Sequence, residues 1–579
     1  MNERAALRSN FPPDSMRGLT RRAEWASLGI PASELSKPKV AIVNASNDLA
    51  ACYAHLDDIV PVLKEHLREA GALPFEIRTS VASDFITSVG KAGRYILPTR
   101  DLMVQDIEVV VEGAQLDAMI CLSSCDKTTP AHLMAAGRLN VPTIIVPCGY
   151  QHSGLADHGG ADIEDVFLNS SFHAYSGTSQ SEMERMADEA ILGPGVCSGL
   201  ATANSMHIVA EVLGMAVAGA APVRATSDRM WDSVRRSAYA LVEAIHRDIR
   251  PRDVITGSSI RNAVVTMLAI GGSINTIKHL QAIAIEAGVE VDVWELYRSL
   301  GREIPLIASV RPNGPALIEE FEDAGGAATI QRELLPYLDA DAPTVTGDTI
   351  GERAATAPTA DGTVIRSVAD PFATTPSIVV VKGTLAEEGA VVKRPIPDPG
   401  PYVFTGPAKI FHTREEGIEA IANGTIREGD VIVLRGVGLV GGPGMGFVSA
   451  LIFAITAAGL AGKVAMVTDG QFSGLANTGI VVGEVSPEAA TGGTIGLLED
   501  DDRIRIDLAE GRVDVLVDPE TLAARPPFVP VAGAEIGGYL DVYRAAVQPL
   551  ACGAVLCDRK GTPLCSRRDE DAHVKGAAR

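Results

Sequence analysis

Three cysteines lie in loops whose neighbours are polar or glycine-rich. They are Cys52, Cys125 and Cys197, and the last stands in the glycine-rich stretch 193–199. Three thiolates can hold an iron–sulfur cluster that leaves one iron open to a substrate. The three lie far apart and form no C-x-x-C pair, so their spacing alone does not establish a cluster. Each one taken alone also fits a buried apolar side chain.

Two carboxylates accompany these cysteines. Asp84 follows an apolar stretch, and Asp126 adjoins Cys125. Carboxylates in loops suit a hard cation such as Mg²⁺, although each alone also fits a solvated surface acid. Lys127 follows Asp126, and its ammonium group would repel a metal ion. It fits such a site if it pairs with a carboxylate, or if carbamylation turns it into an anionic oxygen ligand.

A glycine-rich loop offers a different chemistry. Gly436-Val-Gly438-Leu-Val-Gly441 matches the G-x-G-x-x-G pattern of a dinucleotide site, after an apolar strand. More glycines follow where a helix should begin, and Asp469 stands 28 positions beyond Gly441 instead of about 20. A nucleotide-dependent oxidoreductase that uses the Gly436 loop is therefore one hypothesis. The others are a tightly turning loop and an active-site wall.

The elements that must position these residues alternate along the chain. Buried strands are expected at 40–43, 118–122 and 143–146, with helices at 55–70 and from 133 onward. Apolar strands that alternate with helices indicate a parallel sheet with crossover helices. The sequence therefore predicts the α/β class, with the cysteines and acids in loops of the sheet.

The pattern changes in the second half. Residues 200–340 read as helical, 341–400 are rich in Pro, Gly, Thr and Asp, and strands dominate afterwards. These later strands are expected at 377–382, 408–411, 431–434, 464–468, 503–507 and 513–517. We expect an N-terminal arm (1–37), an α/β domain (38–370) and a β-rich domain (371–579).

Composition excludes some partners. The 579 residues carry a net charge of −23, so the bulk field disfavours nucleic acid and anionic membranes. No stretch reaches the roughly 18 apolar residues of a membrane span, and the N-terminus shows no export signal. We expect a cytoplasmic protein that acts on a small molecule.

At this point the motifs resemble a known family. Cys125-Asp-Lys-Thr-Thr-Pro130 is similar to the C-D-K-x-x-P loop of the dihydroxy-acid and sugar-acid dehydratases, which unite dihydroxy-acid dehydratase with phosphogluconate dehydratase. Further similar segments follow in the family order over roughly residues 38–520. They are Leu97–Asp101, Thr202–Met206, Gly271–Asn275, Gly442–Met445, Thr468–Gly474 and Val485–Ala490.

The resemblance implies a fold, an assembly and ligands. It implies an N-terminal α/β domain with a C-terminal β-barrel-like domain, in a homodimer or homotetramer. The implied cofactors are a 2Fe-2S or 4Fe-4S cluster and Mg²⁺. The implied ligands are Cys52, Cys125 and Cys197 for the cluster, and Asp84, Asp126 and carbamylated Lys127 for Mg²⁺.

The resemblance also implies a reaction. A 2,3-dihydroxy carboxylate would lose water to give an enol, which becomes a 2-keto acid. Ser473 would act as the alkoxide base, once a nearby cation or donor stabilises its alkoxide. The glycine-rich loop would form the wall of the substrate pocket, with Gly444, Met445 and Phe447.

Three positions depart from the family pattern. Phe447 stands where the family has a Mg²⁺-binding glutamate, Tyr53 where asparagine is common, and Glu484 where dihydroxy-acid dehydratases usually have histidine. Phenylalanine cannot coordinate Mg²⁺, so that site has one anionic ligand fewer or is absent. We therefore expect a specialised iron–sulfur hydro-lyase that acts on a sugar acid or a related hydroxy acid. A family member with lost or diverted activity is the alternative.

Overall fold

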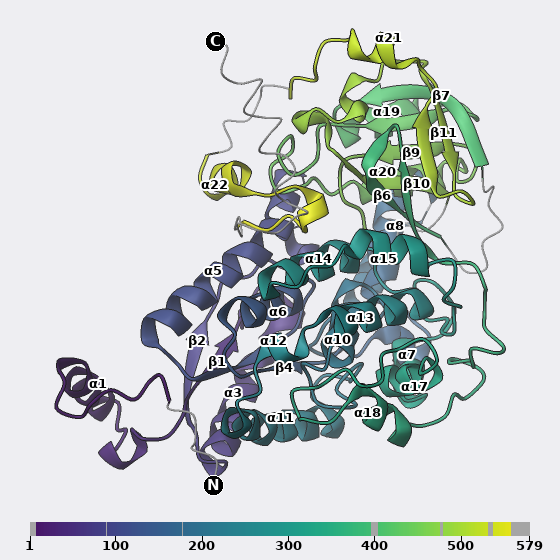
Figure 1. Ribbon diagram of the computed structural model, residues 1–579. Helices are drawn as coiled ribbons and strands as arrows, with labels where there is room; N and C mark the ends of the chain where they lie inside the picture. Colours follow the sequence, from purple (N-terminus) through teal and green to yellow (C-terminus); the bar gives the residue numbers. More distant parts are fainter. Residues whose placement is uncertain are drawn as a thin grey trace, which may run out of the picture.

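The computed structural model describes residues 7–87, 90–176, 178–394, 403–474, 479–530 and 537–556. It contains a four-stranded parallel sheet in the N-terminal half and a closed eight-stranded barrel in the C-terminal half (Figure 1). Helices surround the sheet and fill the space between it and the barrel. The predicted α/β fold with a C-terminal barrel is confirmed.

The sheet has the strand order β2-β1-β3-β4. Its strands are β1 (Lys39–Asn44), β2 (Leu73–Arg78), β3 (Ala118–Ser123) and β4 (Thr143–Pro147). Every residue of β1, β3 and β4 is buried, as expected for Val- and Ile-rich strands covered on both faces. Strand β2, which the sequence analysis does not predict, lies at the edge of the sheet.

Helices pack against this sheet and against one another. Those in contact with the strands are α3 (Leu56–Glu69), α6 (Thr128–Leu139) and α11 (Asp228–Arg247), and α5 (Ile96–Ala114) packs against α6. Three more are buried almost all round and form the centre of the N-terminal half: α10 (Thr202–Val212), α13 (Gly257–Ile270) and α14 (Asn275–Ala287). A helix that is buried on all sides can present polar residues to an internal cavity.

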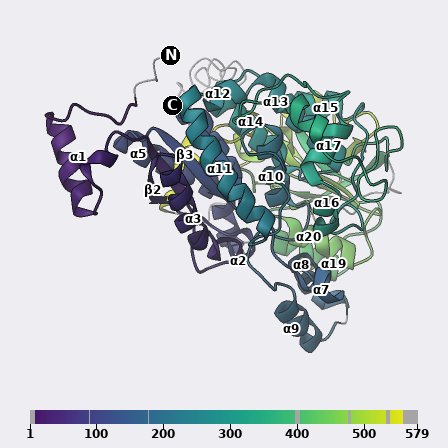
Figure 2. The same cartoon turned by 90° about the horizontal axis from the view of Figure 1, so that it is seen from below.

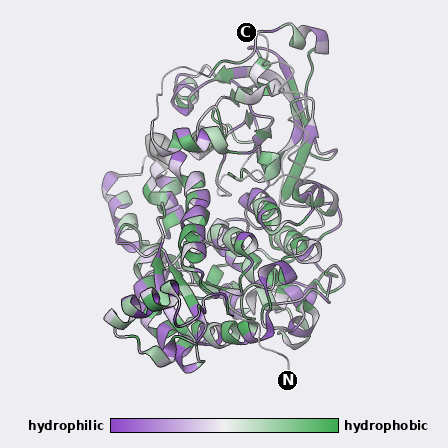
Figure 3. Ribbon diagram, turned by 60° about the vertical axis from the view of Figure 1, so that its left-hand side comes forward, coloured by the Kyte–Doolittle hydropathy of each residue, from purple (hydrophilic) through white to green (hydrophobic). Residues whose placement is uncertain are grey.

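The barrel closes in the order β10-β6-β5-β12-β11-β7-β8-β9. Its strands are β5 (Ile378–Gly383), β6 (Ala386–Lys393), β7 (Val403–Phe411), β8 (Val431–Leu434), β9 (Ala465–Thr468), β10 (Ile480–Ser486), β11 (Arg503–Asp507) and β12 (Arg512–Val515). Valine and isoleucine side chains form a separate core for it. Closure leaves no free strand edge. Figure 3 shows the barrel strands coloured mostly hydrophobic.

The N-terminal segment forms an arm. Helix α1 (Met16–Ser27) buries none of its residues and stands apart from the body (Figure 2). Ser9 holds the base of the arm, since its backbone N–H and its hydroxyl both donate to Asp117 (3.0 and 2.5 Å). In the part of the chain that is described, no helix is long and apolar enough to span a bilayer.

Candidate active site

The carboxyl ends of the parallel strands bring the predicted residues together. Strand β1 leads to Cys52 in α2 (Ala51–Ala54), β2 leads to Asp84 at the start of α4 (Asp84–Thr87), and β3 leads to Cys125, Asp126 and Lys127. Parallel strands end at the same edge of their sheet, where ligands commonly bind. The long separations in sequence thus become short distances in space.

The turn after β3 is fixed by Thr128. Its hydroxyl accepts a hydrogen bond from the N–H of Ser124 (2.8 Å) and donates one to the carbonyl of Cys125 (2.9 Å). Pro130 lies in the first turn of α6, where no N–H is needed. These constraints hold Cys125, Asp126 and Lys127 in a compact turn.

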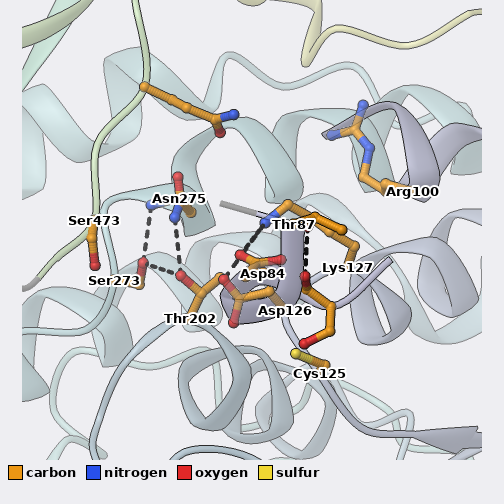
Figure 4. A network of polar contacts seen from close by, with 12 residues as sticks. Asp84, Thr87, Arg100, Cys125, Asp126, Lys127, Thr202, Ser273, Asn275 and Ser473 are labelled. Carbon is orange, nitrogen blue, oxygen red and sulfur yellow. Dashed lines mark hydrogen bonds and ion pairs between the residues drawn. The ribbon is translucent and has the colours of Figure 1, made fainter. Parts of the chain in front are cut away.

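Both halves of the protein line one cavity. The N-terminal half contributes Asp84, Cys125, Asp126, Lys127 and Cys197, and the barrel half contributes Phe447, Gln471 and Ser473. Figure 4 shows Ser473 on the barrel side of the site, while the acids and Lys127 come from the sheet side. Seven residues singled out in the sequence therefore share one cavity.

The three cysteines are free and close to one another. Cys125 is hydrogen-bonded to Cys52, which together with burial raises the pKa of the Cys125 thiol. Burial, followed by the charge of Cys125, raises the pKa of the Cys197 thiol. Asn204 of α10 donates to the carbonyls of Cys197 (2.9 Å) and Gly199 (2.8 Å), which fixes that loop. The cavity itself is lined by Cys125 and Cys197, and Cys52 lies beside Cys125 without lining it.

The acids surround Lys127. Its ammonium lies 3.4 Å from Oδ2 of Asp84 and 3.5 Å from Oδ2 of Asp126. Burial, and then the charge of Asp126, raises the pKa of Asp84 to about 8. Burial opposes the charge on Lys127, but the two carboxylates outweigh it and raise the lysine pKa. Oδ1 of Asp84 is buried and bonded to none of the described residues, so this oxygen has room for a further cationic partner.

Among the described residues, no group of three or more His, Cys, Asp or Glu side chains could hold a metal ion. The oxygen site here offers only two carboxylates, and its third member is a lysine. A magnesium site at this place depends on Lys127 becoming an oxygen ligand, and is a proposal.

The loop that carries Ser473 is held on both sides. The Ser473 N–H donates to the hydroxyl of Ser449 (2.8 Å), and the side-chain amide of Gln471 donates to the carbonyl of Met445 (2.8 Å). The N–H of Glu484 donates to the carbonyl of Gly470 (3.0 Å). These bonds set the place of Ser473 relative to the strands of the barrel.

The three residues expected in the substrate pocket lie in different places. Phe447 lines the cavity described above. Met445 lines a neighbouring cavity, together with Asp469 and Glu488. Gly444 packs against the backbone carbonyl of Arg94. A Cβ atom added at position 444 would lie 1.9 Å from that carbonyl oxygen.

The glycine-rich loop does not offer its amides to a pyrophosphate. Asp469 accepts from the N–H groups of Gly436 and Val437 (both 3.0 Å), and Glu488 accepts from that of Val440 (2.7 Å). A Cβ at Gly438 would lie 1.7 Å from a Glu488 oxygen. The glycines thus make room for these internal carboxylates, which argues against the nucleotide-dependent alternative.

Some residues of the cavity were assigned no role from the sequence. Thr202 and Asn275 line the cavity, and the Asn275 side chain donates to Thr202 (3.0 Å). Ser273 lies behind this lining and is joined to Thr202 through their hydroxyls (2.8 Å) (Figure 4). They stand in family-like segments, which is the only signal that could have indicated them. Glu164 lines the same cavity, and burial followed by the charge of Asp162 raises its pKa to about 8. No sequence pattern marked it.

The fold and site define a class: a two-domain protein whose sulfur- and carboxylate-lined cavity lies between an α/β domain and a β-barrel. Residues 37–353 match the dihydroxy-acid/6-phosphogluconate dehydratase N-terminal family, and residues 363–554 match the C-terminal family of the same name. The chain therefore belongs to the dihydroxy-acid/6-phosphogluconate dehydratase family, and the resemblance seen in the sequence is confirmed.

Relatives match over nearly the full length. A dihydroxy-acid dehydratase of Methanococcoides burtonii is 36% identical over 92% of this chain and 97% of its own. Proteins of the same name from Methanothrix thermoacetophila and Aquifex aeolicus are each 37% identical, over 95% and 92% of this chain and 100% and 97% of their own. Membership of this family identifies a dehydratase, which is a hydro-lyase.

Proposed function

We propose that this protein is an iron–sulfur hydro-lyase that converts a 2,3-dihydroxy carboxylate, a sugar acid or a related hydroxy acid, into a 2-keto acid. One observation carries the proposal: a single cavity is lined by Cys125, Cys197, Asp84, Lys127 and Ser473, which come from both domains. The names of the relatives support dehydration of a dihydroxy acid.

We assign the two implied cofactors to side chains that lie at this cavity or beside it. Cys52, Cys125 and Cys197 are free, buried or half-buried thiols that would hold a 2Fe-2S or 4Fe-4S cluster. Asp84, with its unbonded buried oxygen, and Asp126 would hold Mg²⁺ together with carbamylated Lys127. When bound, these groups supply Lewis acidity at the substrate oxygens.

The side chains supply positioning and proton transfer. The Ser473 alkoxide would take the proton from C2 while the C3–O bond breaks, and the departing hydroxide leaves as water after it gains a proton. The resulting enol becomes the 2-keto acid when C3 gains a proton. A serine hydroxyl has a very high pKa, so its alkoxide needs a neighbouring cation for stabilisation. The metal site proposed at Asp84, Asp126 and Lys127 would supply that cation.

Phe447 supports the alternative of lost or diverted activity. Its ring lines the cavity where the family pattern places a metal-binding glutamate. With Asp84 and Asp126 as the remaining carboxylates, we propose that Mg²⁺ binds weakly and that substrate choice differs from that of dihydroxy-acid dehydratases. The assembly we propose is a homodimer or homotetramer in the cytoplasm.

The test is a product assay on anaerobically purified protein. Iron, sulfide and magnesium are first measured, and the protein is then offered aldonates and branched 2,3-dihydroxy acids. The proposal expects a 2-keto acid to form from at least one of them. A cluster-loaded protein that converts none would support lost or diverted activity instead.

A further inference from the structure

Glu164 is a buried acid in the wall of the cavity. It lies in the first turn of α8 (Ile163–Ser176), and the residue is 2% exposed. Asp162 and Asp165 cap this helix reciprocally, with N–H to carboxylate distances of 2.9 and 3.1 Å. The cap fixes the helix start and thereby the point from which Glu164 reaches the cavity.

The carboxyl group of Glu164 has an unused oxygen. Its Oε1 is fully buried and has no hydrogen-bond partner among the residues described. The nearby Arg311 is engaged elsewhere, at 2.8 Å from Asp165 and 3.5 Å from Asp162. A buried polar atom without a partner is costly, and because Glu164 lines the cavity, a ligand bound there can supply the partner.

Gly199 makes room for this carboxyl group. A Cβ at Gly199 would lie 2.6 Å from Oε1 of Glu164, too close for any larger residue without a shift. Gly199 follows Cys197 by two positions, so Glu164 lies beside the sulfur-bearing loop. After burial and the charges of Cys125 and Asp126, the charge of Glu164 also raises the pKa of the Cys197 thiol, so the two side chains lie close together.

The cavity that Glu164 lines also contains aromatic side chains. Phe85, Phe167 and Phe447 line the same cavity, and the rings of Phe85 and Phe167 meet edge to face at 5.5 Å. A wholly apolar substrate tail would leave Glu164 without a partner. A tail that carries a hydroxyl group would satisfy it, because a hydroxyl both donates and accepts and thus suits either form of the acid.

We propose that Glu164 is a specificity-determining residue that binds a hydroxyl of the substrate beyond C3. The substrate is then a polyhydroxy acid of the aldonate class instead of a branched aliphatic dihydroxy acid. This inference rests on the proposed dehydration, and it goes further by assigning the substrate tail to the part of the cavity that Glu164 lines.

The test compares Glu164→Met and Glu164→Gln on two substrates, a five- or six-carbon aldonate and 2,3-dihydroxy-3-methylbutanoate. We expect Glu164→Met to lower kcat/KM for the aldonate by about 10- to 100-fold, with little loss for the branched acid, since a site built for a hydroxyl then lacks its partner. Glu164→Gln should lose less. Equal losses on both substrates, or an unchanged aldonate value, would overturn the inference.

Glu319→Met is the matched control. Glu319 also has a buried Oε1 with no bond to the described residues, but it is not among the residues that line the cavity. It should leave the ratio of the two kcat/KM values unchanged, and an equal change in that ratio would count against a specific role for Glu164.

A binding measurement separates the two proposals. The aldonate should raise the Tm of the wild type and of Glu319→Met, and raise that of Glu164→Met less, even if no acid is converted. If no acid is converted but these Tm shifts are observed, the proposed dehydration is rejected and the binding role of Glu164 is retained. Equal Tm shifts in all three proteins would reject the role of Glu164.

Discussion

Lys278 of α14 and Glu484 of β10 form an ion pair between the two halves of the protein, with both side chains completely buried. Lys278 also donates to the side-chain carbonyl of Asn275, which lines the cavity. Glu484 takes a positive φ of 57° within the irregular stretch of β10 that begins at Gly483. A β-bulge can redirect a side chain in this way. The ion pair between Glu484 and Lys278 thus connects the cavity wall that carries Ser473 with the wall that carries Asn275.

Breaking this pair should be strongly destabilising. Lys278→Met leaves Glu484 buried without its partner, and we expect a loss of about 3–5 kcal/mol in the free energy of unfolding. Urea unfolding measures this. Glu182→Ala, which removes an exposed partner of Arg185, should leave the urea midpoint close to that of the wild type. A midpoint equally close to the wild type in Lys278→Met would show that the pair does not join the two halves energetically.

The cluster assignment predicts iron content. Cys52→Ser, Cys125→Ser and Cys197→Ser should each sharply reduce bound iron, because a hard oxygen is a poor substitute for a thiolate. Cys148→Ser is the control, since Cys148 is buried directly after β4 and its thiol donates to the carbonyl of Val146 (3.3 Å). Iron and sulfide analysis after anaerobic purification gives the answer. Full iron retention in all three variants would reject the assignment.

The base assignment predicts slow turnover with an intact cofactor. Ser473→Ala should keep the visible absorption and the Tm of the wild type, but lower kcat by at least about a hundredfold, the lower range for loss of a proton-transfer group. A kcat near that of the wild type would leave Ser473 as a turn residue only.

Phe447 predicts a dependence on added Mg²⁺. With Asp84 and Asp126 as the carboxylates, activity should rise with Mg²⁺, and added bicarbonate should raise it further if Lys127 must be carbamylated. Phe447→Glu should tighten Mg²⁺ binding and shift selectivity towards branched dihydroxy acids. Tight stoichiometric Mg²⁺ in the wild type, with an unaltered substrate profile in Phe447→Glu, would contradict this account.

Lys393 predicts a pH-dependent stability. It is buried and donates to the carbonyls of Gly271 (2.6 Å) and Gly272 (2.7 Å), and burial lowers its pKa to about 7. Above pH 7 the unfolded chain keeps a proton that the folded chain has lost, so this group makes stability rise with pH up to its unfolded pKa. Between pH 7.5 and 9.5, the free energy of unfolding of the wild type should increase relative to that of Lys393→Met by up to about 1.4 kcal/mol per pH unit. If the free energies of unfolding of the two proteins change in parallel with pH, this prediction is wrong.

Local patterns predicted much of the fold. The apolar runs of β1, β3, β4, β8 and β9 are short, continuous and rich in Val and Ile, and they were identified close to their observed bounds. Strands β2, β6 and β10 were missed. Pro74 interrupts β2, and Glu387 and Gly389 interrupt the apolar pattern of β6. The predicted boundary between the domains, near residue 370, stays a prediction.

The site shows where sequence reasoning ends. Cys52 and Cys125 could be brought together in advance, because each follows a predicted strand of the same parallel sheet. Asp84 could not, because it follows β2, which was missed. Lys278 and Glu484 are 206 positions apart, and neither residue alone indicates its partner. Likewise, only the three-dimensional structure shows that Glu164 is buried beside Gly199, because no local sequence pattern indicates this contact.

The most direct test of dehydration is the fate of the substrate itself. Anaerobically purified, cluster-loaded protein is incubated with an aldonate in D₂O, and the product is analysed by mass spectrometry and NMR. We predict a 2-keto acid that has lost one water and carries deuterium at C3, because the C3 proton of the product comes from solvent when the enol becomes the ketone. An unchanged aldonate and unchanged branched acids, in the presence of a full cluster and added Mg²⁺, would contradict the assignment of this protein as an active dehydratase.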